Sequence, residues 1–166
     1  MIIEIVGDIF ECLETYNLDA IVNPVNCVGV MGKGLALEFK KRYPANFNKY
    51  KIECDNHSLN LNTVFTTPLW KVEYINDIFH YYFKYLINFP TKYHWKEKSN
   101  LDQISNLLNN NFISELYKCE INKIVLPYLG CGLGELNKED FKNEFYKIYD
   151  TNKSFQSIEF YLIDKE

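Results

Sequence analysis

Two glycine-rich loops carry the strongest chemical signal in this sequence. Six of its seven glycines fall into two trios, Gly29, Gly32 and Gly34 in the first and Gly130, Gly132 and Gly134 in the second. Glycine lets the main chain adopt positive φ angles and come close to a ligand. The free N–H groups of such a loop, and of a helix that follows it, favour a bound phosphate. The loops therefore indicate a phosphate-bearing ligand, while a simple turn is the alternative for either loop alone.

The first loop matches neither of the two common nucleotide-binding patterns. A P-loop requires Ser or Thr after its Gly-Lys pair, and here Gly32 and Lys33 are followed by Gly34. The spacing G-x-x-G-x-G also differs from the dinucleotide fingerprint G-x-G-x-x-G. The loop indicates phosphate without identifying a kinase, an NTPase or a dehydrogenase.

Each glycine trio stands between an apolar run and a helical pattern. The runs Ala20–Val22 and Lys123–Pro127 are typical of short buried strands. The first helical pattern ends at Pro44, and Asn137 is expected to cap the second helix. Glycines needed only for turns would be scattered among the other connections, and only Gly7 lies there. Two such loops suit a diphosphate held between two helix N-termini.

The remaining elements follow from hydrophobic patterning. Strands are expected at Ile2–Val6, Thr63–Lys71, Phe79–Asn88 and Ser157–Ile163. Pro90 is expected to end the strand before it. Ser99 and Asp102 resemble a capping box for an amphipathic helix that bears Leu101, Ile104, Leu108 and Phe112. The polar stretch Asn46–Asn62 is expected to hold a short helix and a surface loop.

Composition and charge narrow the class of protein. The chain of 166 residues is 47% hydrophobic and 16% aromatic, which excludes a disordered chain and suits one domain. No apolar run approaches the ~20 residues of a membrane span, and the N-terminus lacks the basic region of a signal peptide. Five cysteines without a C-x-x-C pair favour a reduced, cytoplasmic protein without a zinc site or disulfides. The net charge of −4 argues against a general nucleic-acid coat but leaves room for a local basic patch.

Two further groups could contact a nucleotide. Asp8 follows the first strand, where its carboxylate could accept hydrogen bonds from an adenine amino group; the commoner alternative is that it caps the next helix. The loop Phe89–Lys98 gathers aromatic and basic side chains. Its rings could stack on an exposed base while its lysines contact phosphates. Equally, Trp95 could pack against the following helix and leave the lysines in solvent.

In their order and spacing, these features resemble the macrodomain family, whose members bind ADP-ribose. The markers are Gly7-Asp8-Ile9, Asp19-Ala20-Ile21-Val22-Asn23, Asn26 and Leu126-Pro127-Tyr128-Leu129-Gly130-Cys131-Gly132. The resemblance covers nearly the whole chain and implies one macrodomain over residues 1–166. The implied fold is a three-layer α/β/α arrangement with a mixed, mostly parallel central sheet and the ligand at the carboxyl ends of its strands.

Three stretches resemble one branch of that family. VNCVGVMGKGLALEFKKRYP, NFPTKYHW and GCGLG are similar to the DarG-type antitoxins and the terminal ADP-ribose protein glycohydrolases. This branch removes ADP-ribose from thymidine bases in DNA or from acidic side chains. Lys92 stands where the branch carries its catalytic lysine.

The resemblance implies further roles for matching residues. Asp8 would hold the adenine amino group, beside the N–H of Ile9. Asn26 would bind the distal ribose within the catalytic site, and Tyr161 would stack on adenine. The diphosphate and distal ribose would be wrapped by Val30, Met31, Gly32, Lys33, Gly34, Gly130, Cys131, Gly132, Leu133 and Gly134. The nucleic-acid half of the substrate would face Tyr93, His94 and Trp95.

Catalysis by Lys92 requires an unusual protonation state. A neutral amine can attack C1″ of the distal ribose and form a Schiff-base-type adduct that water then releases. At an ordinary pKa of ~10.4, about one lysine in a few thousand is neutral at pH 7. A neighbouring diphosphate raises that pKa, so burial, or proton loss within the complex, must compensate. The alternative is a solvated loop lysine or a phosphate contact.

One position departs from the pattern of the branch. Where the protein glycohydrolases carry an Asp after G-C-G-L, this chain has Gly134. That Asp helps to resolve the covalent intermediate, so its absence favours a DarG-like activity. Glu135 or His94 could take its place as acid–base group. Cys27 and Cys131 are expected to pack in tight loops rather than to act as nucleophiles.

The sequence therefore favours an ADP-ribosyl glycohydrolase, free of metal and cofactor, that acts on ADP-ribosylated single-stranded DNA. Two alternatives remain: a reader that binds ADP-ribose without catalysis, and a hydrolase of ADP-ribosyl-glutamate on proteins or of O-acetyl-ADP-ribose. We expect a cytoplasmic monomer, with a separately encoded toxin ADP-ribosyltransferase as its candidate partner and no membrane contact.

Overall fold

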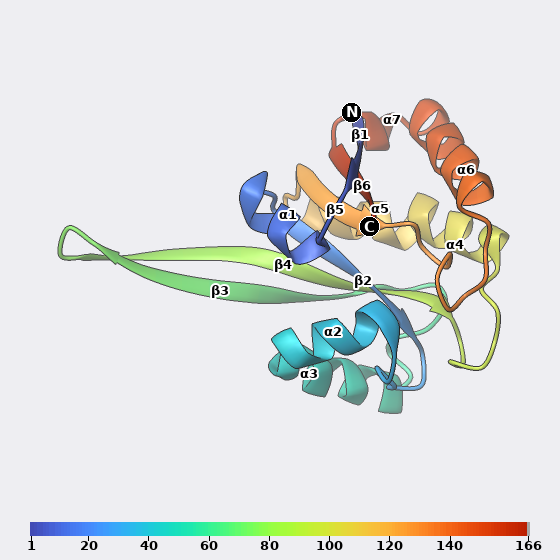
Figure 1. Ribbon diagram of the computed structural model, residues 1–166, viewed down its shortest axis with the longest axis horizontal. Helices are drawn as coiled ribbons and strands as arrows, with labels where there is room; N and C mark the ends of the chain where they lie inside the picture. The colour runs from blue at the N-terminus through green and yellow to red at the C-terminus, as the bar shows by residue number, and fades with distance from the viewer. Residues whose placement is uncertain (166) are drawn as a thin grey trace.

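The computed structural model describes residues 1–165 and shows a six-stranded sheet in the order β1-β6-β5-β2-β4-β3 (Figure 1). Its strands are β1 (Ile2–Val6), β2 (Ala20–Asn26), β3 (Phe65–Ile75), β4 (Ile78–Lys92), β5 (Lys123–Pro127) and β6 (Glu159–Asp164). Neighbouring strands run parallel except at one edge, where β3 pairs antiparallel with β4. The expected mixed, mostly parallel sheet is confirmed.

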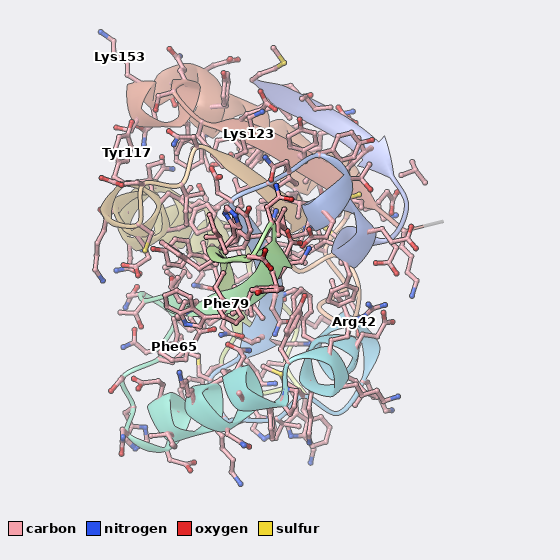
Figure 2. The ribbon with its side chains drawn as sticks, turned by 90° about the vertical axis from the view of Figure 1, so that its left-hand side faces the viewer. Arg42, Phe65, Phe79, Tyr117, Lys123 and Lys153 are labelled. Atoms are coloured by element: carbon pink, nitrogen blue, oxygen red, sulfur yellow. The ribbon has the colours of Figure 1, made fainter. Side chains whose placement is uncertain are left out.

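Helices cover both faces of this sheet. One face carries α1 (Ile9–Thr15), α2 (Gly34–Arg42) and α3 (Pro44–Asp55). The other face carries α4 (Leu101–Leu107), the π-helical segment η1 (Leu108–Phe112), α5 (Ile113–Lys118), α6 (Lys138–Thr151) and α7 (Lys153–Gln156). Figure 2 shows α2 and α3 on the opposite side of the sheet from the later helices. The three-layer α/β/α fold expected from the sequence is confirmed.

Coverage on both faces explains the apolar run in β2. Ala20 and Val22 pack toward the later helices, whereas Ile21 packs toward α1 and α2. A strand buried on both faces reads as continuous apolar sequence rather than as an alternation. None of the helices formed by residues 1–165 is long and apolar enough to cross a membrane.

Two prolines behave differently from expectation. Pro44 does not simply follow α2; it is the first residue of α3, a 12-residue helix where we expected a short helix and a loop. The first turn of a helix has no N–H bond for a proline to lose. Pro90 does not end β4, which continues to Lys92. Because β3 pairs with β4 only as far as Asn88, Pro90 lies where β4 has a neighbour on one side only.

The helix that follows the Phe89–Lys98 loop begins at a different cap. Asn100, rather than Ser99, caps α4 by accepting a hydrogen bond from Gln103 N at 3.0 Å. The apolar face expected for this helix is present, since Ile104, Leu108 and Phe112 are buried. The expected cap of α6 by Asn137 is confirmed.

The β3–β4 hairpin extends well beyond the helical layers (Figure 1). Asn76 and Asp77 form its two-residue turn, with φ angles of 51° and 63°. Both values lie in the left-handed region that a type I′ turn requires and that these residue types tolerate. β3 therefore runs to Ile75, beyond Lys71, the residue at which the sequence predicted its end.

Candidate functional site

The loops that leave β2 and β5 lie side by side, because those strands are parallel neighbours. β2 leads to α2 on one face of the sheet, whereas β5 leads to α6 on the other. A crevice forms where neighbouring strands send the chain to opposite faces, and open α/β sheets bind ligands at such points. The two glycine loops meet here: Leu133 Cδ1 would lie 3.4 Å from a Cβ placed on Gly34.

A cleft of about 670 Å³ lies at this edge of the sheet. It is formed by the loop after β1, the start of α2 and the ends of β5 and β6. Clefts of this size hold small-molecule ligands and cofactors. Of the predicted ADP-ribose contacts, Asp8, Ile9 and Gly34 line the cleft, whereas Asn26 and the second glycine loop do not. The predicted adenine end of the site is therefore an open cleft, and the predicted catalytic end is built from loops.

Asp8 caps α1 and keeps its second oxygen at the cleft. Its Oδ1 accepts hydrogen bonds from Phe10 N at 2.7 Å and from Glu11 N at 3.4 Å. Its Oδ2 lies 3.8 Å from the Arg42 guanidinium, with the carboxylate 38% exposed. Ile9 is the first residue of α1, so its N–H has no carbonyl partner within the helix. The commoner alternative, the cap, is observed; the adenine contact stays a prediction.

One of the two helix N-termini expected around the diphosphate is open. α2 begins at Gly34, whose φ of +58° favours glycine, and Lys33 before it provides no side-chain cap. α6 is capped by Asn137, which accepts from Glu139 N at 2.8 Å and from Asp140 N at 3.2 Å. This is the cap that the sequence predicted; it uses those N–H groups, and two carboxylates in the first turn repel an anion, so the diphosphate has only the N-terminus of α2 open to it.

Asn26 shapes the first glycine loop. Its Nδ2 donates to Val30 O at 2.7 Å, and its Oδ1 accepts from Val28 N at 3.1 Å and Val30 N at 3.3 Å. The buried hydroxyl of Tyr50 donates to the main-chain oxygen of Asn26 at 2.8 Å. Met31 is buried beneath the loop while Val30 is exposed. A ribose contact through the Asn26 amide stays a prediction.

Lys92 ends β4 opposite Asn26, its register partner on β2. Its Nζ donates to Leu133 O at 2.7 Å and to Glu97 O at 3.0 Å, so it joins the second glycine loop to its own loop. Partial burial lowers the pKa of Lys92, while the charges of Glu135 and Glu97 oppose that shift. The net lowering is the direction that a nucleophilic amine requires.

The structure explains why position 134 holds a glycine. A Cβ at Gly134 would overlap the Ser99 hydroxyl and the Gly130 carbonyl oxygen. Ser99 is buried, and its N–H donates to Gly134 O at 2.9 Å. An aspartate, as the protein glycohydrolases carry here, does not fit this loop unless Ser99 moves.

The two candidates for the missing acid differ in their surroundings. Glu135 is exposed, and its carboxylate lies 2.8 Å from Lys98 Nζ, which lowers the pKa of Glu135. A carboxylate held ionised suits a general base better than a general acid. His94 is partly buried, and its Nδ1 accepts from Lys96 N at 3.2 Å. In the neutral ring Nε2 therefore carries the proton. The geometry gives neither candidate a contact with Lys92 Nζ.

The aromatic side chains after Lys92 form a cluster open to solvent. Tyr93 is 46% exposed and Trp95 is 49% exposed. The ring of His94 lies 5.2 Å from that of Trp95, and Lys96 Nζ lies 5.0 Å from the Trp95 ring. About half of the Trp95 side chain is therefore open to solvent, beside the His94 ring.

Tyr161 is not brought to the cleft. It is 7% exposed, its ring lies 5.0 Å from that of Tyr16, and its hydroxyl donates to Glu159. Ile163, two residues further along β6, lines the cleft instead. The expectation that Tyr161 stacks on adenine was wrong for this arrangement, because the ring fills the core between α1 and the sheet.

Cys27 and Cys131 pack in the loops, as expected. Burial raises the pKa of Cys27 to about 12 and that of Cys131 to about 11, so both thiols stay protonated near pH 7. Within residues 1–165, His, Cys, Asp and Glu side chains form no group of three that could hold a metal ion.

Sequence analysis did not identify three residues that support the site. Tyr50 of α3 holds Asn26, Arg42 of α2 lies beside Asp8, and Ser99 fills the space above Gly134. Tyr50 and Arg42 come from helices remote in sequence from their partners, and no spacing rule connects them. Ser99 had a signal, but we interpreted it as a helix cap.

Comparison with known proteins agrees with this geometry. Residues 22–143 match the Macro domain family model. A DNA ADP-ribosyl glycohydrolase of Mycobacterium tuberculosis is 36% identical over 131 residues, which cover 79% of this chain and 35% of that protein. A DNA ADP-ribosyl transferase–DNA ADP-ribosyl glycohydrolase fusion protein of Thermosipho africanus is 35% identical over 125 residues, 68% of this chain and 30% of that protein.

A solved structure extends the similarity to the complete fold. The macrodomain of Mycobacterium tuberculosis DarG superposes with a TM-score of 0.83 at 30% identity, covering 100% of this chain and 99% of that chain. This chain spans about a third of the length of the curated relatives it matches. With the sheet order, the cleft at the start of α2 and the family match all in agreement, the chain belongs to the Macro domain family.

Proposed function

We propose that this chain is an ADP-ribosyl glycohydrolase that removes ADP-ribose from modified thymidine in DNA, with Lys92 as its catalytic residue. The observation that carries the proposal is the position of Lys92 Nζ at the junction of two loops, with hydrogen bonds to Leu133 O and Glu97 O. A neutral amine that donates both of its N–H groups to these carbonyls keeps its lone pair free for attack. Burial, which lowers the pKa of Lys92, favours that neutral form.

Three observations support DNA as the substrate. The Mycobacterium tuberculosis relative is named a DNA ADP-ribosyl glycohydrolase. Tyr93 and Trp95 are half exposed close to Lys92, where rings can stack on an unpaired base, worth ~1–3 kcal/mol per base. Gly134 has no room for the aspartate of the protein glycohydrolases.

In this proposal the ADP-ribose lies along the crevice, with adenine near Asp8 and the distal ribose near Lys92. The free N–H groups at the start of α2 bind the diphosphate. Lys92 Nζ forms a bond to C1″ as the bond from C1″ to the thymine nitrogen breaks, and the electron pair stays with the base, which takes up a proton. The adduct loses a proton from its nitrogen, whose lone pair then forms the C=N bond of a Schiff base as the C1″–O4″ bond breaks and the ring oxygen takes up a proton. Water hydrolyses the Schiff base and restores the amine. No metal or cofactor takes part.

We also propose an antitoxin role in the cytoplasm, opposite a toxin ADP-ribosyltransferase. The Thermosipho africanus fusion protein is named for both a DNA ADP-ribosyl transferase and a DNA ADP-ribosyl glycohydrolase. The two named reactions add and remove one modification. Co-expression should therefore rescue cells from such a transferase, and Lys92→Ala should abolish the rescue.

The test of the proposed activity uses a single-stranded oligonucleotide that carries ADP-ribosyl-thymidine. We expect the wild-type protein to restore the unmodified strand, with or without EDTA. Lys92→Ala should bind free ADP-ribose in calorimetry but lose turnover by a factor on the order of 10³ or more.

Other outcomes identify the alternatives. If both proteins bind ADP-ribose and neither releases it, the chain is a reader, and the two carbonyl contacts make Lys92 a structural link between loops. If only ADP-ribosyl-glutamate or O-acetyl-ADP-ribose is cleaved, DNA is the wrong substrate. If both proteins act on the oligonucleotide, Lys92 is not the catalyst.

A further inference from the structure

One face of the projecting β3–β4 hairpin is apolar and exposed. It carries Trp70, Val72 and Tyr74 from β3, with Phe79 and Phe83 opposite Tyr74 and Trp70 on β4. These side chains are between 50% and 67% exposed. Figure 2, viewed from the hairpin end, shows Phe79 in front of the sheet. Apolar patches of this kind on a soluble domain mark interaction surfaces.

The opposite face of the hairpin carries charged side chains together with the exposed apolar Ile75 and Ile78, and it turns toward α1 at its base. Lys84 Nζ donates to Leu13 O at 3.0 Å and to Leu18 O at 2.8 Å. Lys71 lies 2.8 Å from the Glu73 carboxylate on the same face. Residues 1–165 thus leave the face with Trp70, Val72 and Tyr74 open, while the charged pair of β3 lies on the other face.

The outer edge of β3 is also free, because β3 is the last strand of the sheet. In a type I′ hairpin the residues that flank the turn, here Ile75 and Ile78, form a hydrogen-bonded pair, and the pattern alternates along the strands. The main-chain N–H and C=O groups of Trp70, Val72 and Tyr74 consequently point outward. An exposed, apolar edge of this length is a template for a further strand.

The edge sequence is complementary to itself about Val72. If two copies pair antiparallel with their Val72 residues opposite each other, Trp70 of each copy faces Tyr74 of the other. Lys71 likewise faces Glu73, an opposite charge. The outward-pointing residues then form the hydrogen-bonded pairs, as an antiparallel ladder requires. Centring the pair on Lys71 or on Glu73 would instead set like charges opposite each other.

We propose that this chain forms a two-fold symmetric dimer by antiparallel pairing of the β3 edges, with Val72 on the axis. The pairing joins the two sheets into one continuous sheet. The tip of the hairpin lies at the opposite end of β4 from Lys92, so both candidate active sites stay open. A dimer differs from the monomer expected from the sequence, in which no pattern indicates that this edge projects from the domain.

Sedimentation velocity over a range of protein concentrations tests the proposal. The wild type should change from one chain mass toward twice that mass as concentration rises. Lys71→Glu and Glu73→Lys should each weaken dimerisation by about tenfold or more, because each sets like charges opposite at two symmetric positions. An equimolar mixture of the two variants should dimerise as tightly as the wild type, since charges of opposite sign then face each other.

The mixture also controls for loss of the ion pair between Lys71 and Glu73 within one chain. Both variants lose the Lys71–Glu73 contact, and mixing does not restore it within either chain. Val72→Pro, which removes an outward N–H and leaves the β4 ladder intact, should abolish the dimer while turnover on the modified oligonucleotide is unchanged. A single chain mass at every concentration, or a mixture as weak as its components, would overturn the proposal.

Discussion

Replacing Gly134 by alanine should destabilise the protein by about 3 kcal/mol, near the upper end of the usual cost of overpacking. The new Cβ would overlap the Ser99 hydroxyl and the Gly130 carbonyl oxygen, and it would lie 2.9 Å from Ser99 Cβ. The carbonyl cannot move freely, because it accepts the hydrogen bond of Leu136 N at 3.0 Å. For a chain of this length, 1 kcal/mol shifts Tm by ~2–4 °C. The unfolding midpoint should therefore fall by roughly 6–12 °C.

Thermal unfolding followed by circular dichroism measures this effect, with Gly132→Ala as the matched control. Nothing lies within 4 Å of a Cβ at Gly132, so that variant should stay within ~2 °C of the wild type. Adding Ser99→Gly to Gly134→Ala removes one of the two overlaps and should recover part of the loss. Equal midpoints for Gly132→Ala and Gly134→Ala would refute the steric reason for glycine at this position.

Three other changes follow from the site and its support. Tyr50→Phe removes the hydroxyl that donates to the Asn26 carbonyl, so it should lower the free energy of unfolding in urea by ~1–2 kcal/mol and weaken ADP-ribose binding in calorimetry. Unchanged binding would mean that the first glycine loop does not need this hydrogen bond. Turnover should rise with pH as Lys92 loses its proton. Glu135→Gln removes a charge that raises the pKa of Lys92, so it should move this rise to lower pH; an unchanged pH profile would mean that the charge of Glu135 does not influence the titration of Lys92. Asn88→Ala should lower the free energy of unfolding in urea by ~2–4 kcal/mol, because Asn88 hydrogen-bonds the buried Asn23 and Asn46. A decrease below ~1 kcal/mol would contradict this prediction.

Local patterning was sufficient for much of the fold. Ile2–Val6 and Lys123–Pro127 have the same bounds in the sequence prediction and in the structure. Asn137 signals its helix through a short-range hydrogen bond, which a sequence displays directly. Both glycine loops follow strands of a parallel sheet, and the carboxyl ends of such strands lie at the same edge of the sheet, so the proximity of the loops could also be predicted. Signals that act over a few residues are the ones a single sequence reveals.

Tertiary placement decided what the sequence could not. Pro90 can continue β4 only because β3 stops pairing at Asn88, a fact about neighbouring strands. Gly134 is explained by the side chain of Ser99, which is 35 residues earlier in the sequence. Tyr161 looked like a ligand contact because of its residue type, yet its register on β6 points it into the core. In each case a partner distant in sequence sets the outcome.

Covalent trapping tests the central claim most directly. The wild-type protein is incubated with the ADP-ribosylated oligonucleotide and cyanoborohydride, which reduces a Schiff base to a stable amine, and its peptides are then mapped by mass spectrometry. If Lys92 attacks C1″, the peptide that contains it should gain the mass of reduced ADP-ribose, and Lys92→Arg should gain none. Rapid release of ADP-ribose without an adduct on Lys92, or with an adduct on another residue, would contradict the mechanism.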